Sequence, residues 1–247
     1  MILRSGLKDC REHGPFRGET CPVCNSEGRM LMNYREIEGV GRVLAGMLRH
    51  FPENYGVRLD DHGWIRIYTI VPPIRLQKKQ FGWLTPYHIE ALALTDPKER
   101  YQVSKNHEIR AAYGHTIPIE MDDLPTDDIP PKLYYQTTEE ELEFINETGI
   151  SPSDKTWVHL SLTYRQAYVA GLYHVDSPTI VEVDSEKLIE SGRPIYRATS
   201  DVFVVKEIPP EFIVVSEPEE VELTESEQKD IETVKERREK RIRREGA

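Results

Sequence analysis

The spacing of the cysteines constrains the fold most, because all three lie within the first 24 residues. With one histidine they form the pattern Cys10-x2-His13-x7-Cys21-x2-Cys24. Two such pairs offer four soft ligands that can converge on a tetrahedral zinc ion, and the proline in the second pair suits a tight turn. A disulfide would leave one cysteine over in a chain with no recognisable signal peptide. We therefore expect a structural zinc knuckle over residues 1–34, with unpaired structural thiols as the alternative.

The composition is that of a folded protein with an uneven charge. The chain has 247 residues, and residues 1–115 hold 17 basic and 13 acidic side chains, whereas residues 116–247 hold 15 and 30. The first half is therefore the candidate for binding a polyanion, although solvated surfaces also produce such differences. No apolar run approaches the roughly 18 residues that a membrane span requires. We expect a soluble, cytoplasmic protein with no membrane partner and no obligate protein partner.

An apolar stripe predicts a helix over residues 36–50. Its members recur at the spacing of one helical face, namely Val40, Val43, Leu44, Met47 and Leu48. The helix must end before Pro52, which disfavours the α conformation at the residue before it. Arg49 and His50 then lie in the last turn, off the buried face. One interpretation is that two cations favour a helix C-terminus; the other is that they bind a substrate.

The rest of the first half predicts a winged helix over residues 35–117. Strands are expected at 57–59 and 65–67 around a turn at 60–63, and Thr85-Pro86 opens a second helix. Two further strand-like runs, 100–103 and 108–114, form a hairpin. Such units commonly dock on nucleic acid, though many pack only against protein.

The second half predicts an α+β sheet domain. An acidic stretch with four prolines marks a linker at 118–131. A helix capped by Thr138-x-x-Glu141 is expected to end near Gly149, and another covers 164–171. The tail, 217–247, reads as a charged, solvated helix, and an appendage without a binding role is favoured over an RNA arm. The strands are expected at 132–137, 157–162, 179–184, 194–199 and 202–208.

Chemical motifs are few. There is no G-x-G-x-x-G after a strand, no P-loop, no H-E-x-x-H and no G-x-S-x-G. What remains is a set of cations suited to phosphate, which guanidinium groups hold through paired, charge-assisted hydrogen bonds. These residues are Arg42, Arg49, His50, Arg110 and His115.

Longer segments carry a resemblance to a known family. The runs "RVLAGMLRHFPENYGVRLDDHGWIRI", "EIRAAYGHTI", "KLYYQTT", "WVHLSLTYRQAYVAG", "IVEVD" and "IPPEFI" occur in this order. In this the chain resembles the NAD-dependent RNA 2′-phosphotransferases, and an archaeal-type branch with an N-terminal Cys/His knuckle. The similarity spans about residues 38–213. It implies an RNA lobe joined to an ADP-ribosyltransferase-like NAD lobe over residues 132–216.

The resemblance also implies a reaction. An internal RNA 2′-phosphate of the splice-junction type, as in tRNA, would pass to NAD, giving 2′-OH RNA, nicotinamide and ADP-ribose 1″,2″-cyclic phosphate. Arg49 and His50 would bind the phosphate, together with Arg110. Arg42 and His115 would be further phosphate or RNA contacts. The residues implied for NAD are Tyr134, Tyr135, Thr137, His159 and Ser161. For His159, a strand histidine satisfied in the core is an equally simple interpretation.

Two departures from the family pattern leave alternatives open. The usual L-Y-H-G-T reads Leu-Tyr-Tyr-Gln-Thr here, so Tyr135 and Gln136 replace a histidine and a glycine. The fourth basic residue is missing near Tyr173, where His174 or Arg165 would have to substitute. The alternatives are therefore an ADP-ribosyltransferase acting on nucleic-acid ends, and an RNA-binding protein with an impaired NAD lobe.

Overall fold

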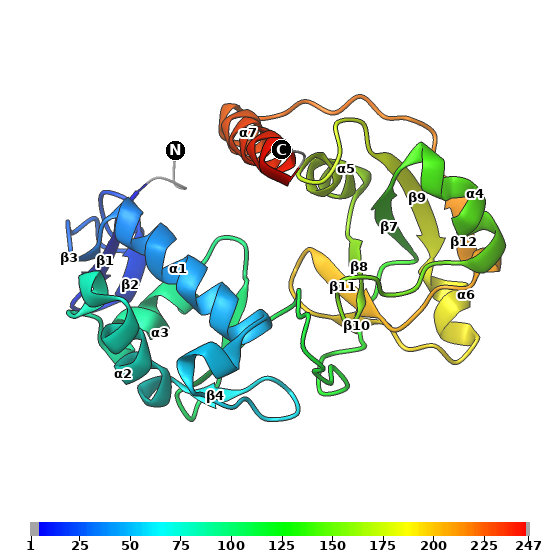
Figure 1. Cartoon of the computed structure of the whole chain (residues 1–247). Coiled ribbons are helices and arrows are strands. Elements are labelled where there is room, and N and C mark those ends of the chain that lie inside the picture. The colour runs from blue at the N-terminus through cyan, green and yellow to red at the C-terminus, as the bar shows by residue number, and fades with distance from the viewer. Residues whose placement is uncertain (1–4, 246–247) are drawn as a thin grey trace. The chain divides into compact units, whose positions relative to one another are not determined.

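The structure is a computed structural model that describes residues 5–245, and it divides into two compact units (Figure 1). The first unit runs to Asp123 and takes in Asp154–Thr156. The second comprises Leu124–Ser153 and the chain from Trp157 onward. Each unit has its own hydrophobic core. Both contain helices and sheets, so the predicted mixture of α and β structure is confirmed.

The first unit begins with a small antiparallel sheet of strand order β2-β1-β3. Its strands are β1 (Leu7–Cys10), β2 (Gly14–Arg17) and β3 (Arg29–Met32). The side chains of Leu7 and Met32 are fully buried in the same core as the helices that follow. The cysteine-rich segment is therefore packed into the first unit.

Three helices and a second sheet complete this unit. They are α1 (Tyr34–Arg49), α2 (Ile67–Gln77) and α3 (Pro86–Leu94), with short 3-10 turns η2 (Pro52–Tyr55) and η3 (Lys79–Phe81). The sheet has the order β4-β6-β5, from β4 (Ile65–Arg66), β5 (Tyr101–Val103) and β6 (Glu108–Ala111). The predicted helix before Pro52, the helix opened by Thr85 and the hairpin of β5 and β6 are confirmed.

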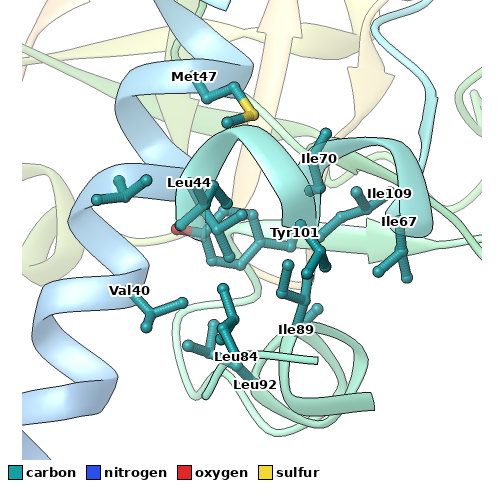
Figure 2. Close-up of a cluster of buried hydrophobic side chains, with 14 of the residues drawn as sticks. Val40, Leu44, Met47, Ile67, Ile70, Leu84, Ile89, Leu92, Tyr101 and Ile109 are labelled. Atoms are coloured by element: carbon teal, nitrogen blue, oxygen red, sulfur yellow. The ribbon is translucent and has the colours of Figure 1, made fainter. Parts of the chain in front are cut away.

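The predicted apolar stripe of α1 forms the centre of the core. Figure 2 shows side chains of α1, α2 and α3 converging with those of β5 and β6. Val40, Leu44 and Met47 are fully buried, and the Tyr101 hydroxyl donates a hydrogen bond of 2.8 Å to the Gly41 carbonyl. Asn33 and Glu36 form a capping box that fixes where α1 begins.

The predicted strand pair at 57–59 and 65–67 is wrong in two respects. The turn is present, since Asp60 accepts hydrogen bonds from the backbone of His62 and Trp64. However, residues 57–59 form no strand, and the second run provides only β4 before α2 begins at Ile67. Pro72 and Pro73 lie inside α2, where proline removes backbone donors. Burial of Ile67, Ile70, Val71 and Ile74 against the core outweighs that local cost.

The second unit is built on a six-stranded sheet of order β10-β11-β8-β7-β9-β12, with every neighbouring pair antiparallel. The predicted strands are present, and β12 was not predicted. The strands are β7 (Lys132–Thr137), β8 (Val158–Ser161), β9 (Thr179–Asp184), β10 (Tyr196–Arg197), β11 (Val202–Val205) and β12 (Ile213–Val215).

Four helices and the 3-10 turn η4 (Pro210–Phe212) accompany this sheet. The predicted helices are α4 (Glu139–Thr148), α5 (Tyr164–Leu172) and the tail helix α7 (Glu225–Glu245), whereas α6 (Ser185–Glu190) was missed. Among residues 5–245, no helix is both long and apolar enough to span a membrane.

The stretch predicted as a linker is partly packed. Ile119, Met121 and Leu124 are buried, and the boundary between the two units falls after Asp123. The finer division into knuckle, winged-helix lobe, linker, ADP-ribosyltransferase-like lobe and tail stays a prediction.

Candidate functional site

The candidate phosphate site lies in the first unit at the C-terminal end of α1. Arg49 is the last residue of this helix, and its guanidinium lies over the ring of Tyr113, 4.9 Å from the ring centre. Gly114 follows with a φ of +83°, and a Cβ there would stand 3.3–3.5 Å from the guanidinium atoms of Arg49. Glycine at this position therefore permits both the left-handed backbone conformation and the close approach of the Arg49 side chain.

The guanidinium of Arg49 is only partly satisfied. Its Nε and Nη2 atoms are buried and have no hydrogen-bond partner among residues 5–245. A buried donor without a hydrogen-bond partner lowers stability by about 1–3 kcal/mol, and by more when the group is charged. Two donors on one guanidinium suit an anion that accepts two hydrogen bonds, as phosphate does. Because both atoms are buried, the side chain or its neighbours would have to move to admit that anion.

His50 is held beside this arginine by a hydroxyl. Its Nδ1 lies 3.0 Å from Thr116 Oγ1, and the backbone N–H of Thr116 donates a 3.0 Å hydrogen bond to the Arg49 carbonyl. Burial lowers the pKa of His50, and the positive charges of Lys155 and Arg49 lower it further. Asp154 acts in the opposite direction. Within the first unit, the helix end and residues 113–116 and 154–155 thus form one cationic cluster, in which Arg49 and Lys155 carry the positive charge.

Arg110 on β6 is engaged by protein groups. It is only 3% exposed, and its Nη1 lies 2.8 and 2.9 Å from the two carboxylate oxygens of Asp123. Its Nε donates to Gln102 Oε1 at 2.7 Å, and the guanidinium lies 4.5 Å from the ring centre of Trp64. In this conformation protein groups therefore engage Nε and Nη1 of Arg110, and the side chain is almost fully buried.

The two remaining predicted phosphate contacts differ in exposure. Arg42 is exposed on α1, whereas His115 is 1% exposed and packed near Gly63, at which a Cβ would lie 3.7 Å from His115 Nε2. In this conformation Arg42 is open to a polyanion and the His115 ring is enclosed.

The residues predicted for NAD lie in the second unit on two faces of its sheet. Paired residues of an antiparallel ladder share a face, and alternate residues of a strand do too. Tyr134 is paired with Ser161, so these two residues and His159 lie on one face, together with Gln136. Tyr135 and Thr137 point to the other face. A single ligand on one face could contact the first group and not the second.

The second face contains structural contacts. Tyr135 packs against the main core of this unit, and the Thr137 hydroxyl donates a 2.7 Å hydrogen bond to Glu141 in the first turn of α4. Thr137 is 4% exposed. Contacts within the second unit therefore explain the burial and orientation of the Thr137 side chain without a bound ligand.

Helix α5 packs on the face that carries Tyr134. The ring of Tyr134 contacts that of Tyr164 edge-on at 6.3 Å, and at Gly171 a Cβ would lie 3.1 Å from Gln136 Cβ. Arg165, one proposed substitute for the missing cation, is paired with Glu227 of α7 at 2.7 and 3.1 Å. His174 is the other proposed substitute, and its backbone carbonyl accepts a hydrogen bond from Arg238.

The four predicted zinc ligands come together in the first unit. Their donor atoms all lie within 4.8 Å of one another. The separations are 3.5 Å between Cys10 Sγ and His13 Nδ1, 3.6 Å between Cys10 and Cys24 Sγ, and 3.7 Å between Cys21 Sγ and His13 Nδ1. A tetrahedral zinc with Zn–S bonds of about 2.3 Å places its ligands about 3.7 Å apart. The donor set therefore fits zinc.

The Ser26 hydroxyl lies within hydrogen-bond distance of two of these cysteines. Ser26 Oγ lies 3.4 Å from Cys10 Sγ and 3.3 Å from Cys24 Sγ. Hydrogen bonds from Ser26 and from nearby backbone N–H groups lower the pKa of Cys10 to about 6. Thiolate is the form that binds metal.

Sequence patterns did not single out Tyr113, Gly114, Thr116 or Asp123. Three of them flank the buried His115, and no periodicity marks a residue that acts by touching the end of a helix 64 to 67 positions earlier. Only the glycine carried a signal, since glycine is common where a turn needs a positive φ.

These features define a mixed α and β protein with a cationic cluster at a helix end and a cysteine-histidine cluster. The family model for "RNA 2′-phosphotransferase, Tpt1/KptA family" matches residues 35–207, and the chain belongs to this family. A "Probable RNA 2′-phosphotransferase" of Thermoplasma acidophilum is 53% identical over 95% of this chain and 98% of its own length. Proteins of the same description from Thermoplasma volcanium and Methanosarcina barkeri are 49% and 38% identical over 91% and 85% of this chain, and over 95% and 99% of their own lengths.

Proposed function

We propose that the protein removes an internal 2′-phosphate from RNA, of the kind left at a splice junction, and transfers it to NAD. The products are RNA with a 2′-hydroxyl, nicotinamide and ADP-ribose 1″,2″-cyclic phosphate. The observation that carries the proposal is the Arg49 guanidinium, which keeps two buried nitrogens without hydrogen-bond partners among the described residues. It lies within the segment that the family model matches.

In this proposal the α1 end binds and stabilises the phosphoryl group. Arg49 donates two hydrogen bonds to phosphate oxygens, held in place by Tyr113 and Gly114. His50 exchanges a proton at the same group. Fixed donors aimed at developing charge are an effective form of catalysis, and they cost no reorganisation during the reaction.

Tyr134, His159, Ser161 and Gln136 are the residues proposed to bind NAD, because they share one face of the sheet in the second unit. NAD supplies an electrophilic ribose carbon, to which the phosphate oxygen bonds as nicotinamide leaves. The hydroxyl and amide groups of these residues suit ribose hydroxyls, and the Tyr134 and His159 rings offer apolar surface.

The cysteine-histidine cluster is proposed to hold one structural zinc ion. All four donors come from protein side chains, which leaves no position for a reacting water. The metal would fix the β1–β3 sheet and through Leu7 and Met32 the core of the first unit.

The family motif assigns Arg110 to phosphate binding, although its guanidinium forms an ion pair with Asp123. If phosphate competes with that carboxylate, Asp123→Asn weakens the competitor and should lower the KM for phosphorylated RNA. An unchanged or higher KM would instead give Arg110 a purely structural role. Asp127→Asn, a change in the second unit, serves as the control.

A catalytically impaired RNA-binding protein is the second candidate. The neutralised charge of Arg110 favours it, as do Tyr135 and Gln136 at the positions of the family's histidine and glycine. An ADP-ribosyltransferase acting on nucleic-acid ends is the third.

An RNA carrying one radiolabelled internal 2′-phosphate, incubated with the protein and NAD, separates the three candidates. The proposal predicts that label leaves in a small cyclic product. Label that stays on ADP-ribosylated RNA indicates the third candidate, and binding without NAD consumption indicates the second. Arg49→Ala should lower kcat by about 10²- to 10³-fold, as removal of a transition-state donor does. Arg75→Ala, an exposed arginine on α2, is the matched control.

A further inference from the structure

Thr116 makes two side-chain contacts at the α1 end. Its Oγ1 lies 3.0 Å from His50 Nδ1 and 3.3 Å from the carbonyl oxygen of Arg49. Its backbone N–H donates to that same carbonyl at 3.0 Å. The backbone bond fixes the residue against the helix end, and the hydroxyl then sits between an imidazole nitrogen and a carbonyl oxygen.

The single hydroxyl proton of Thr116 determines the state of the ring. A carbonyl oxygen can only accept, so the contact with Arg49 exists as a hydrogen bond only if the hydroxyl donates to it. The hydroxyl oxygen then accepts from His50, which requires a proton on Nδ1. The opposite arrangement, in which the hydroxyl donates to Nδ1, forfeits the bond to the carbonyl. The first arrangement makes two hydrogen bonds and the second makes one.

We propose that Thr116 is a positioning residue that keeps His50 protonated at Nδ1, so that Nε2 is the atom that gains or loses a proton at the phosphate site. The proposal rests on the phosphotransfer function proposed above. A neutral ring in this state presents a lone pair at Nε2, which can take the proton of the ribose hydroxyl that attacks phosphorus to form the cyclic product. The N–H bond forms at Nε2 as that O–H bond breaks, and the new P–O bond forms as the bond between phosphorus and the RNA 2′-oxygen breaks. The proton then passes from Nε2 to the leaving 2′-oxygen, and the contact with Thr116 is kept throughout.

The charges around the ring are compatible with this role. Arg49 and Lys155 oppose protonation of His50, and Asp154 favours it. A second proton on Nε2 therefore meets repulsion from two cations, which keeps the ring neutral and able to accept a proton near neutral pH.

Nuclear magnetic resonance of the ring nitrogens tests the inference without an activity assay. In the full-length protein labelled with ¹⁵N-histidine, the His50 signals are assigned by their loss in His50→Gln. We expect the Nδ1–H tautomer in the wild type, and a shift towards Nε2–H in Thr116→Val, which replaces the hydroxyl by a methyl group. Thr116→Ser keeps the hydroxyl and should restore the wild-type signals. An Nε2–H tautomer in the wild type, or no change in Thr116→Val, would overturn the proposal.

Kinetics test the consequence for catalysis. Thr116 is exposed, so its substitution removes a hydrogen bond and little packing. We expect Thr116→Val to lower kcat by about 10- to 100-fold, by analogy with the range for groups that orient metal-binding histidines, with the KM for RNA unchanged. Thr116→Ser should recover most of the rate, and Thr69→Val, an exposed threonine on α2, should match the wild type. Equal kcat in Thr116→Val and wild type would refute the positioning role, whereas a wild type without any transfer would refute the proposed function instead.

Discussion

At the scale of single residues, two glycines of the first unit show how backbone conformation serves the site. Gly114 has a φ of +83° and lies against the Arg49 guanidinium. Gly46 lies within α1, where an added Cβ would meet no atom within 4 Å. The first glycine is required by its surroundings and the second is not.

We therefore expect opposite effects from the same substitution. Gly114→Ala should destabilise the protein by about 1–3 kcal/mol, because a residue with a side chain is strained at that φ, and it should lower transfer by displacing Arg49. Gly46→Ala should stabilise by about 0.5–1 kcal/mol, the helix preference for alanine. Urea denaturation of both variants measures the difference, and a neutral Gly114→Ala would contradict this account of the site.

The pKa of His50 gives a second prediction at this scale. Lys155→Met removes a nearby positive charge and should raise the pKa of His50, since Lys155 lowers it in the wild type. Titration of the His50 ring signals measures the change, with Lys105→Met in the β5–β6 turn as control. A constant or lower pKa would show that Lys155 does not act on the ring.

The same pKa has a consequence for stability. Because folding lowers the pKa of His50 below its ordinary value of 6.5, the unfolded chain binds more protons as the pH falls below 6.5. The contribution of this residue to stability is therefore complete above pH 6.5 and decreases as the pH falls towards the folded-state pKa.

At the scale of elements, the tail helix α7 is docked on the second unit. Figure 1 shows α7 beside α5, and Arg165 of α5 pairs with Glu227 at 2.7 Å. Ile231 is 5% exposed, and Arg238 pairs with Asp176 at 2.7 Å. Exposed ion pairs contribute little, about 0–1 kcal/mol each, so the buried isoleucine is expected to provide most of the attachment.

Ile231→Ala should therefore loosen α7 more than any loss of charge. We expect the docking free energy to fall by about 2 kcal/mol, the lower end for a buried isoleucine. Trypsin, which cleaves after the many lysines and arginines of this helix, should then cut it about 10-fold faster or more. Glu232→Ala, on the exposed side, should leave the cleavage rate unchanged. Equal rates in both variants would mean that α7 is not held by this contact.

At the scale of the whole molecule, the cysteine-histidine cluster and the core of the first unit are linked. Leu7 and Met32 flank the cysteine-rich segment and are fully buried in the same hydrophobic core as the apolar side chains of α1. Loss of the metal should therefore destabilise the first unit and not only the knuckle.

The tryptophans allow this to be measured. Trp64 and Trp83 belong to the first unit and Trp157 to the second. Chelation should lower the melting temperature followed in Trp157→Phe and leave that followed in the Trp64→Phe, Trp83→Phe double variant almost unchanged. His13→Gln should bind less than stoichiometric zinc and melt like the chelated protein, whereas His107→Gln should not. A melting temperature that does not respond to chelation would exclude a structural metal.

Sequence reasoning predicted the elements whose signals are local. The α1 stripe, the caps at Thr85 and Thr138 and the alternation in the sheet strands depend on neighbours a few residues away, and each is present. It failed where packing outweighed local preference. Helix α2 was not predicted because it contains two prolines, although one of its faces is buried in the core. Family resemblance predicted membership of the RNA 2′-phosphotransferases, which is confirmed, and the use of NAD, which stays a prediction.

The sequence by itself determined that three cysteines and a histidine suited to metal binding would converge, because their spacing is local. It also determined that Arg49 and His50 would lie at the end of a helix, because the apolar periodicity and Pro52 fix that end. Only the tertiary structure decided which groups touch those residues. Thr116 meets His50 across 66 positions of sequence, and Asp123 neutralises Arg110. It also placed Tyr134 and Thr137 on opposite faces of one sheet. Such contacts depend on register and chain reversal, which bring distant residues together and leave no periodic trace.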